Sequence, residues 1–392
     1  MKELWSDKRK RQQFLFSYAT FLLNGMMALS IGSLLPFIRE ARAIDYAFGG
    51  MIVSLHSVGN LISSFFAGTL AVTFGRKRSI LFFNVFYALS YALIIFGNSN
   101  MCLALAFLMT GLARGATSNF NNVVVNNLAP GKAWIINGLH AMFSVGAFAF
   151  PLLLTVLTAS ASEQWIYACY FMLAMGILSW LMYVLIPVEE VKQEKKEGNK
   201  SWGFFKEPMF LLCTATLFFY LCAEQGVIGW MVTYFEDTGL LSASLSQMMA
   251  SIQWIMILAG RLTTAYLSTK IDKSKLLRIM GTGLVLFFVV LITAKTTPQI
   301  VVGIIGFGYS MAGIYPTTVS FAGKIIQKYS LTWSFMLTIA GLGSIIMPSV
   351  IGKIAETSGI FLGMCSIVAV VIIDMILIVA LTAYVKREQA SE

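Results

Sequence analysis

Apolar runs long enough to cross a membrane recur along the whole chain, separated by short segments rich in charged residues, glycine and proline. A membrane-spanning α-helix needs roughly 20 mainly apolar residues, and twelve runs reach that length. The pattern therefore predicts an all-α membrane protein with twelve transmembrane helices. The predicted spans are 13–38, 47–72, 79–97, 101–127, 134–158, 164–186, 208–235, 243–269, 276–294, 298–323, 331–352 and 359–385.

One internal boundary interrupts this pattern. The run VEEVKQEKKEGNK at 188–200 is the only long polar stretch, and it separates six predicted helices from six others. We therefore expect an N-terminal six-helix half at 1–187, a cytoplasmic linker at 188–207 and a C-terminal six-helix half at 208–392. Two halves joined by a linker are a common layout of carriers that are built from repeats.

Composition and charge fix the expected environment and orientation. The chain is 58% hydrophobic and 12% charged, whereas soluble domains carry about 25% charged residues. With both termini in the cytoplasm, 22 of the 28 Lys and Arg residues lie on cytoplasmic segments and 4 on outer segments. This bias satisfies the positive-inside rule, and it accounts for the net charge of +10 without nucleic acid. We expect a multi-pass protein of the cell inner (plasma) membrane.

The sequence offers no catalytic machinery. It contains no G-x-x-x-x-G-K-[ST] loop, no H-E-x-x-H and no G-x-S-x-G, which argues against ATP-driven transport and against hydrolytic enzymes. The five cysteines lie in apolar spans without metal-ligand spacing. We therefore expect no enzyme activity, no catalytic residue, no metal and no cofactor other than a coupling ion.

Several stretches resemble known transporters. GTLAVTFGRKR at 68–78 resembles the loop 2–3 motif of the major facilitator superfamily, although Val72 stands at its usual acidic position. Other stretches are similar to the fucose and glucose permease branch of that superfamily: YLCAEQGVIGWMVTYF (220–235), WIMILAGRL (254–262), GFGYSMAGIYPT (306–317) and GLGSIIMPSVIGKIAE (341–356). The resemblance implies cation-coupled uptake of a sugar by alternating access. Proton-coupled fucose permeases carry buried carboxylates on helices 1 and 4, where this chain has Asn24 and other asparagines.

Polar residues collect near the centres of several predicted spans. Amides donate to and accept from sugar hydroxyls, and an indole offers a flat apolar face for a ring. A common depth on several helices is what a site for a polar solute at the bilayer midplane requires. The predicted substrate contacts are Asn24, Asn119, Asn122, Glu224, Gln225, Gln253, Trp254 and Tyr309.

The stretch NFNNVVVNN at 119–127 carries five asparagines. At about 100° per residue, three of them share one stripe, and three polar residues of the following span form a second stripe at matching depth. This inner polar stripe predicts either a hydrogen-bonded zipper between the two helices or a face turned to the transport cavity. The residues concerned are Asn119, Asn122 and Asn126, with Asn137, His140 and Ser144 opposite.

Glu224 is the predicted cation-coupling residue. A carboxylate near the middle of a membrane span is costly and indicates function. Glu224 with Tyr220 belongs to a polar-aromatic face of its helix, and Gly226 and Gly229 predict a break beside it. The alternative is a structural ion pair with an arginine of another span.

Other charged residues are interpreted as gating or structural ion pairs. Arg114 resembles the helix 4 arginine of the superfamily, Arg261 lies toward the inner end of its span, and Asp374 lies on the last helix. The basic end of the loop motif is assigned to the cytoplasmic gate. The full set is Arg76, Lys77, Arg78, Arg114, Arg261 and Asp374.

These features together predict a secondary transporter that takes up a monosaccharide or similar polyol with a proton or sodium ion. The expected partners are a small polar substrate and the lipid bilayer, with no nucleic acid, and the expected state is a monomer. A drug or lipid exporter working by proton antiport is the alternative, because 21 methionines suit an adaptable apolar cavity. A membrane enzyme or sensor without transport is a further alternative.

Overall fold

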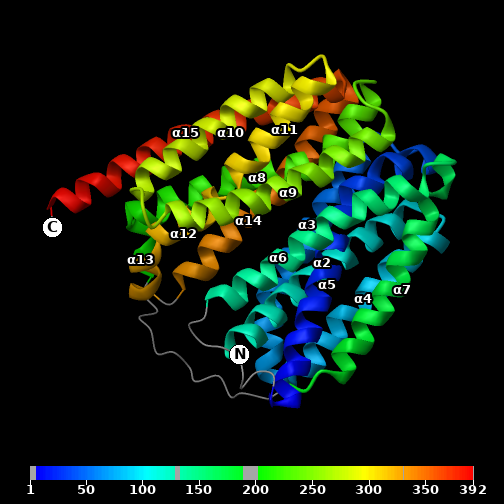
Figure 1. The fold of residues 1–392 in the computed structure, drawn as a ribbon, viewed down its shortest axis with the longest axis horizontal. Coiled ribbons are helices and arrows are strands. Elements are labelled where there is room, and N and C mark those ends of the chain that lie inside the picture. Colours follow the sequence, from blue (N-terminus) through cyan, green and yellow to red (C-terminus); the bar gives the residue numbers. More distant parts are fainter. Residues whose placement is uncertain (1–5, 129–132, 189–201, 330, 392) are drawn as a thin grey trace. The chain divides into compact units, whose positions relative to one another are not determined.

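The computed structural model describes residues 6–128, 133–188, 202–329 and 331–391, without the side chains at 67–69, 72, 133, 134, 390 and 391. Across these ranges the chain is almost entirely helical, and none of the described residues forms a strand (Figure 1). The helices group into two compact units. Unit 1 comprises Met1–Ala43 and Met51–Glu194, and unit 2 comprises Ile44–Gly50 and Lys195–Glu392.

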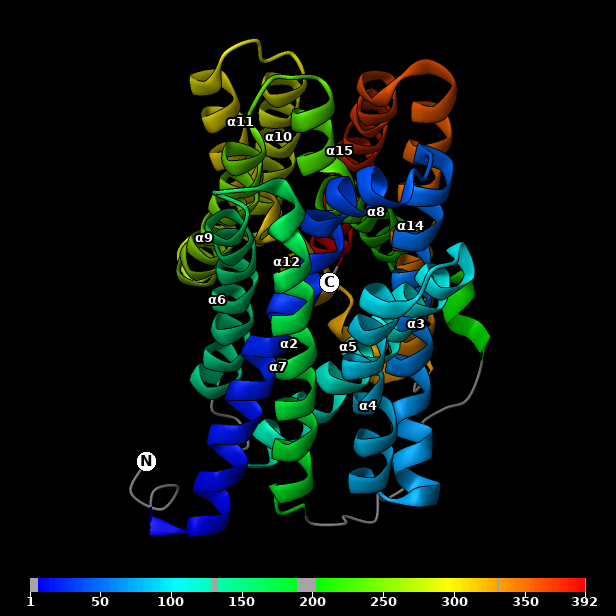
Figure 2. The same cartoon turned by 90° about the vertical axis from the view of Figure 1, so that its right-hand side faces the viewer.

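Unit 1 is a bundle of long helices around the buried middle of α2. Figure 2 shows α4 and α5 of this bundle side by side. Two glycines bring α2 against α6, because a Cβ at Gly25 would overlap the backbone of Phe143 and one at Gly146 would overlap the backbone of Leu22. The helices are α2 (Lys8–Arg42), α3 (Tyr46–Phe74), α4 (Arg76–Phe96), α5 (Asn100–Leu128), α6 (Ala133–Leu157) and α7 (Trp165–Leu185), with the short 3-10 helix η1 (Ser162–Gln164).

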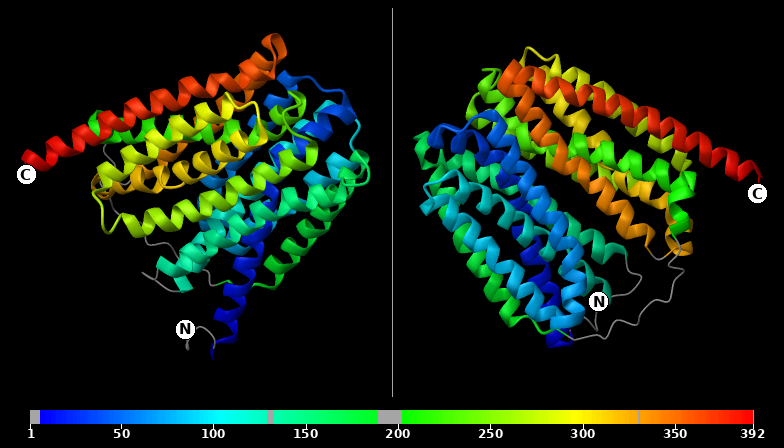
Figure 3. Two further views of the ribbon diagram at one scale, coloured as in Figure 1. Left: turned by 45° about the horizontal axis from the view of Figure 1, so that its top comes forward. Right: turned by 180° about the vertical axis from the view of Figure 1, so that it is seen from behind.

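Unit 2 is built around α8, which packs against α9, α14 and α15. Figure 3 shows α10 lying along α15 in the same unit. The indole Nε1 of Trp230 on α8 donates to the carbonyl of Pro348 on α14 at 2.9 Å. The elements are η2 (Trp202–Lys206), α8 (Pro208–Asp237), α9 (Ala243–Leu267), α10 (Lys273–Ile292), α11 (Thr297–Met311), α12 (Ile314–Phe321), α13 (Gly323–Lys328), α14 (Thr332–Ser358) and α15 (Ile360–Ser391).

The first turn of α3 groups with unit 2. The Tyr46 backbone N–H donates to Oε2 of Glu356 at 2.8 Å, and its hydroxyl donates to Oδ2 of Asp237 at 2.7 Å. A Cβ at Gly50 would lie 2.5 Å from the Pro348 carbonyl oxygen. Two hydrogen bonds and a close backbone approach therefore hold this turn against α8 and α14.

The twelve predicted spans are helical in the structure, which confirms the all-α prediction. Ten of the described helical segments are long and apolar enough to cross a membrane. The other two predicted spans correspond to α3, with 29 residues, and α9, with 25 residues. At about 1.5 Å per residue both exceed the roughly 30 Å thickness of a bilayer core. Most of the predicted linker, 189–201, lies outside the described residues.

Two details of the predicted helices differ. The break expected at Gly226 and Gly229 is absent, because α8 continues from Pro208 to Asp237. Gly226 instead admits side chains of neighbouring helices, with Ile351 and Ile367 methyls 3.0 and 3.1 Å from the position of a Cβ. The small size of glycine, and not its flexibility, is therefore what serves the packing at this position.

The predicted span 298–323 is divided into α11 and α12. The interruption lies at Ala312 and Gly313, four and three positions before Pro316. Pro316 has no backbone N–H to donate to the carbonyl of residue 312, four positions earlier. The helix resumes with the Thr317 N–H bonded to the Gly313 carbonyl at 3.1 Å.

Candidate functional site

A buried polar group in unit 1 joins α3 to α5. The His56 ring bonds through Nδ1 to the Thr110 hydroxyl at 2.8 Å and through Nε2 to Nη1 of Arg114 at 3.2 Å. The helices approach closely here because a Cβ at Gly111 would overlap the His56 carbonyl, and one at Gly59 would overlap that of Leu108. The guanidinium of Arg114 also lies 5.9 Å from the centre of the Phe143 ring on α6.

The donor and acceptor directions of these hydrogen bonds show which ring nitrogen of His56 carries the proton. The Thr110 hydroxyl donates to the Phe107 carbonyl at 2.6 Å, so it accepts from Nδ1–H of His56. An arginine can only donate, so Nε2 of His56 offers its lone pair to Arg114. His56 is therefore the neutral Nδ1–H tautomer, and its ring is one of the partners that hold Arg114.

Asn24 is buried on α2 and faces α5. Its Nδ2 donates to the Ser118 hydroxyl at 2.9 Å, and the residue is 0% exposed. Its Oδ1 has no hydrogen-bond partner among the described residues. Since buried amide oxygens are normally bonded, Asn24 keeps one acceptor open.

The stripe predicted on α5 separates into different environments. The Asn119 amide donates to the Ser64 carbonyl of α3 at 3.4 Å, whereas the Asn122 amide donates to the Ser118 carbonyl of its own helix at 2.8 Å. On α6, the Ser144 hydroxyl bonds to the His140 carbonyl at 3.3 Å. These bonds do not form the predicted zipper. Asn126 and Asn137 are exposed.

The sequence analysis missed the most connected asparagine of this stretch. Asn121 is fully buried, and its Nδ2 donates to the Thr20 hydroxyl at 3.0 Å and to the Tyr183 hydroxyl at 2.9 Å. Tyr183 in turn bonds Thr20 at 3.0 Å. The group links α2, α5 and α7, and its role is structural. Only its position away from the polar stripe distinguished it beforehand.

In unit 2, Glu224 lies midway along α8 and is partly exposed. The Tyr220 hydroxyl donates to its Oε1 at 2.9 Å. The ring of Tyr315, from α12, lies 6.2 Å from the Tyr220 ring. A carboxylate at mid-span is therefore positioned by one tyrosine and bordered by another.

The remaining unit 2 candidates differ in exposure. Gln253 and Trp254 are buried on α9, and Nε2 of Gln253 lies 3.8 Å from the Met311 sulfur on α11. Gln225 is buried on α8. Tyr309 is 39% exposed on α11. A Cβ at Gly308 would lie 2.8 Å from the Gln253 carbonyl oxygen, so this glycine permits close packing of α9 and α11.

The ion pairs expected for Arg261 and Asp374 are not formed among the described residues. Neither residue forms a salt bridge with another described residue. A salt bridge does form at the N-terminal end of α8, between Lys328 and Glu207. Asp374 is 0% exposed, and neither of its carboxyl oxygens has a partner in the described part of the chain. The side chain is therefore buried without a cation partner in the part of the chain that the structure describes.

The basic loop motif lies at the start of α4. Lys77 Nζ donates to the Ile186 carbonyl at the end of α7, at 3.1 Å. Arg76 lines a cavity of about 500 Å³ together with residues of the α2 N-terminus, and Arg78 is exposed. The side chain of Val72 is outside the described ones. The motif therefore ties helix ends together within unit 1.

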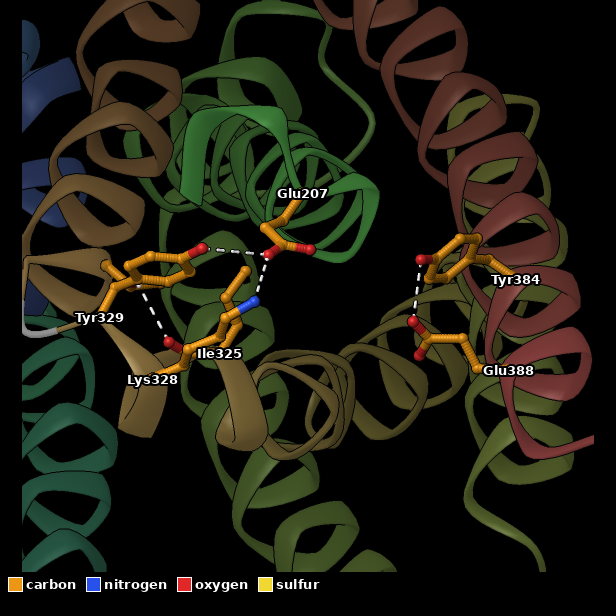
Figure 4. Close-up of polar contacts among 7 residues, drawn as sticks. Glu207, Ile325, Lys328, Tyr329, Tyr384 and Glu388 are labelled. Carbon is orange, nitrogen blue, oxygen red and sulfur yellow. Dashed lines mark hydrogen bonds and ion pairs between the residues drawn. The ribbon is translucent and has the colours of Figure 1, made fainter. Parts of the chain in front are cut away.

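A polar cluster that sequence reasoning did not find lies at the N-terminal end of α8 (Figure 4). Glu207 stands at the N-cap position of this helix. Its Oε1 accepts from Lys328 Nζ at 2.8 Å and from the Tyr329 hydroxyl at 3.3 Å. The hydrogen bond from Lys328 holds the pKa of Glu207 below its usual value. The same bond raises the pKa of Lys328.

A metal centre receives no support from the described residues. Within them, no group of three or more His, Cys, Asp or Glu side chains could hold a metal ion. The chemistry available to the described side chains is hydrogen bonding by amides, hydroxyls and one partly exposed mid-span carboxylate.

Comparison with known proteins agrees with this fold. The family model described as Major Facilitator Superfamily matches residues 16–348. The chain is 22% identical over 352 residues to a protein named Protein TsgA homolog from Yersinia enterocolitica, covering 88% of each chain. A homolog of the same name from Yersinia pseudotuberculosis is 22% identical over 379 residues, covering 95% of each chain.

Two solved structures share the fold at low identity. The nucleoside transporter NupG superposes with a TM-score of 0.73 at 16% identity, covering 96% of this chain and 99% of the other. A D-xylose-proton symporter superposes with a TM-score of 0.77 at 14% identity, covering 95% and 97%. At these identities the likeness concerns the fold.

Proposed function

Because the chain belongs to the Major Facilitator Superfamily, we propose that it takes up a monosaccharide or similar polyol together with a proton or sodium ion. The family and the similar structures are transporters, so the chain is a multi-pass membrane transporter and not an enzyme. The substrate, the coupling ion, a monomeric state and an inner membrane location with cytoplasmic termini form the proposal.

The Tyr220–Glu224 pair carries this proposal. A carboxylate in a membrane span is costly and marks proton or ion pathways by default. Glu224 is partly exposed and has no cation partner among the described residues, so its charge is not neutralised there by a structural salt bridge. A carboxyl group held by one hydroxyl can gain and lose a proton without breaking an ion pair.

A sugar suits the polar groups that surround these positions. Amides and hydroxyls of each unit present both donors and acceptors, as polyol recognition requires. The stretches 220–235 and 306–317 resemble the fucose and glucose permease branch. Among structures of the same fold, one is named for transport of a nucleoside and another for D-xylose with a proton, which favours a small polar substrate.

The coupling ion follows from the same groups. In proton coupling, Glu224 would be the group that binds the transported proton. In sodium coupling, its charged carboxylate would ligate the ion, because hard cations prefer oxygen ligands. The open Oδ1 of Asn24 is a further oxygen acceptor in unit 1. A proton gradient and a sodium gradient must therefore be tested separately.

The test is uptake of labelled monosaccharides into proteoliposomes that contain the purified chain. A proton gradient or a sodium gradient is imposed, and wild type is compared with Glu224→Gln. We expect one gradient to drive accumulation of one sugar. Glu224→Gln should abolish accumulation while counterflow persists, because exchange needs no net movement of the ion.

Glu163→Gln is the matched control. Glu163 is an exposed carboxylate of η1 between α6 and α7, and its replacement should leave accumulation unchanged. Equal loss in both variants would remove the special role of Glu224. If neither gradient drives accumulation of any sugar, the sugar proposal is overturned. Proton-driven efflux of an apolar drug or lipid would replace it with the exporter.

A further inference from the structure

A basic groove lies where the start of α10 meets the end of α15 in unit 2. Its volume is about 660 Å³. Its antiparallel walls are in contact, since Nε of Arg278 on α10 donates to the Thr382 hydroxyl on α15 at 2.6 Å. The lining residues are Asp272, Ser274, Lys275, Arg278, Ile279, Thr282, Thr382 and Lys386.

Cationic side chains dominate the groove. Lys275, Arg278 and Lys386 line it, and none of them forms a salt bridge among the described residues. Asp272 is the one acidic residue, and its Oδ1 accepts from the Lys275 backbone N–H at 3.0 Å as the cap of α10. Three cations against one carboxylate leave the groove positively charged.

Arg278 is oriented for an anion. Its Nε is bonded to Thr382, which fixes the plane of the guanidinium and leaves its two terminal nitrogens without a described partner. A planar arginine fork matches the geometry of phosphate oxygens. The hydroxyls of Ser274 and Thr282 line the same groove and can donate as well.

Exposed apolar side chains continue from the groove along both helices. Ile279 is 55% exposed on α10 and Ile376 is 62% exposed on α15. On α10, Leu286 lies about two turns beyond Ile279, and on α15, Val379 lies between Ile376 and the groove; both are exposed. Hydrocarbon chains would remain in contact with these side chains while a charged head group occupied the groove. A soluble anion would use the charges only.

We propose that this groove binds the phosphate head group of an anionic phospholipid. The lysines and the arginine contact the phosphate, and the acyl chains lie along the exposed apolar side chains of α10 and α15. The groove is at the end of α15 that the distribution of Lys and Arg places toward the cytoplasm, where basic pockets between membrane helices bind anionic head groups. This inference does not depend on the transported substrate.

Native mass spectrometry of the full-length protein in neutral detergent tests the site. Phosphatidylglycerol and phosphatidylcholine with the same acyl chains are titrated separately. We expect preferential binding of phosphatidylglycerol. Lys275→Ala with Lys386→Ala should weaken its binding about tenfold or more, the scale expected for two cations near a lipid phosphate, and should leave the Arg278–Thr382 bond in place.

The matched control removes two other exposed cations beside the groove. Lys273 and Arg387 neighbour the lining residues without lining the groove, and Lys273→Ala with Arg387→Ala should retain phosphatidylglycerol binding. If the first double variant does not fold, Lys386→Gln alone replaces it, because this exposed residue lies in the last turns of α15.

Three results would overturn the proposal. One is equal affinity for phosphatidylglycerol and phosphatidylcholine. Another is equal loss of binding in the groove and control variants. The third is binding of inorganic phosphate alone as tight as that of the lipid, which would make a soluble anion the ligand.

Discussion

Nε2 of His56 lies 3.2 Å from Nη1 of Arg114, so a neutral histidine ring is the acceptor that holds the arginine of α5. The arrangement joins two helices through one side chain from each, and the Thr110 hydroxyl completes it. It also sets the position of the Arg114 guanidinium over the Phe143 ring.

The tautomer of His56 is directly measurable. The chain has two histidines, so His140→Gln leaves His56 as the only imidazole. Nitrogen NMR of histidine-labelled protein at neutral pH should show a protonated Nδ1 and a bare Nε2. Detection of the Nε2–H tautomer or of a charged ring would contradict these hydrogen-bond directions, because the Arg114 donor would then face a second donor.

Close packing of α3 on α5 should fail when Gly111 is enlarged. Gly111→Ala places a methyl into the backbone of His56, and overpacking costs typically 1–3 kcal/mol. Thermal unfolding in detergent should show a lowered midpoint. Gly323→Ala is the control, because nothing lies within 4 Å of its Cβ position, and alanine there should raise the midpoint slightly. Similar effects at both positions would contradict this account.

The Glu207–Lys328 pair should stabilise unit 2 over a defined pH range. The lowered pKa of Glu207 makes its contribution complete above its ordinary pKa of 4.5, and that contribution is lost as the pH falls through the folded value. The raised pKa of Lys328 makes its contribution complete below its ordinary pKa of 10.5. That contribution is lost as the pH rises through the folded value.

Glu207→Gln should therefore lower the unfolding midpoint at pH 7 and have a smaller effect at pH 3, which lies below the ordinary pKa of Glu207. Melting curves of wild type and variant at the two pH values measure the difference. An equal effect at both would mean that the charge of Glu207 is not what stabilises the N-terminal end of α8. Glu388→Gln is a comparison at an exposed carboxylate nearby, which bonds the Tyr384 hydroxyl at 2.8 Å.

Asp374 should be replaceable without loss of stability. Its carboxyl is buried without a described partner, and burial of a polar group without hydrogen bonds is unfavourable. Asp374→Leu keeps the branching at Cγ and should leave the unfolding free energy unchanged or raise it. A loss of about 3–5 kcal/mol is typical of a broken buried ion pair, and it would restore the ion-pair interpretation.

The length and position of the helices could be predicted because crossing a bilayer imposes them. The partners of individual side chains could not. The angles of Asn119 and Asn122 place them on one face of α5 but do not say which helix that face meets, and their bonds go to α3 and to α5 itself. Asn121 depends on Thr20 and Tyr183, which are distant in sequence.

The partners of the charged candidates could not be predicted from the sequence either. The cost of a mid-span carboxylate identified both Glu224 and Asp374 from sequence. Whether such a group meets a tyrosine, a cation or neither depends on the rotation of each helix about its axis. Glu224 meets Tyr220 one turn away on α8, whereas Asp374 meets no described partner.

The interruption between α11 and α12 divides one membrane crossing into two rods of 15 and 8 residues. A rod that short carries few internal hydrogen bonds, and the missing proline N–H removes one more at the joint. Amide hydrogens around Ala312 and Gly313 should consequently exchange with deuterium ahead of those in the unbroken α8. The joint is where this crossing can bend while both of its rods stay helical.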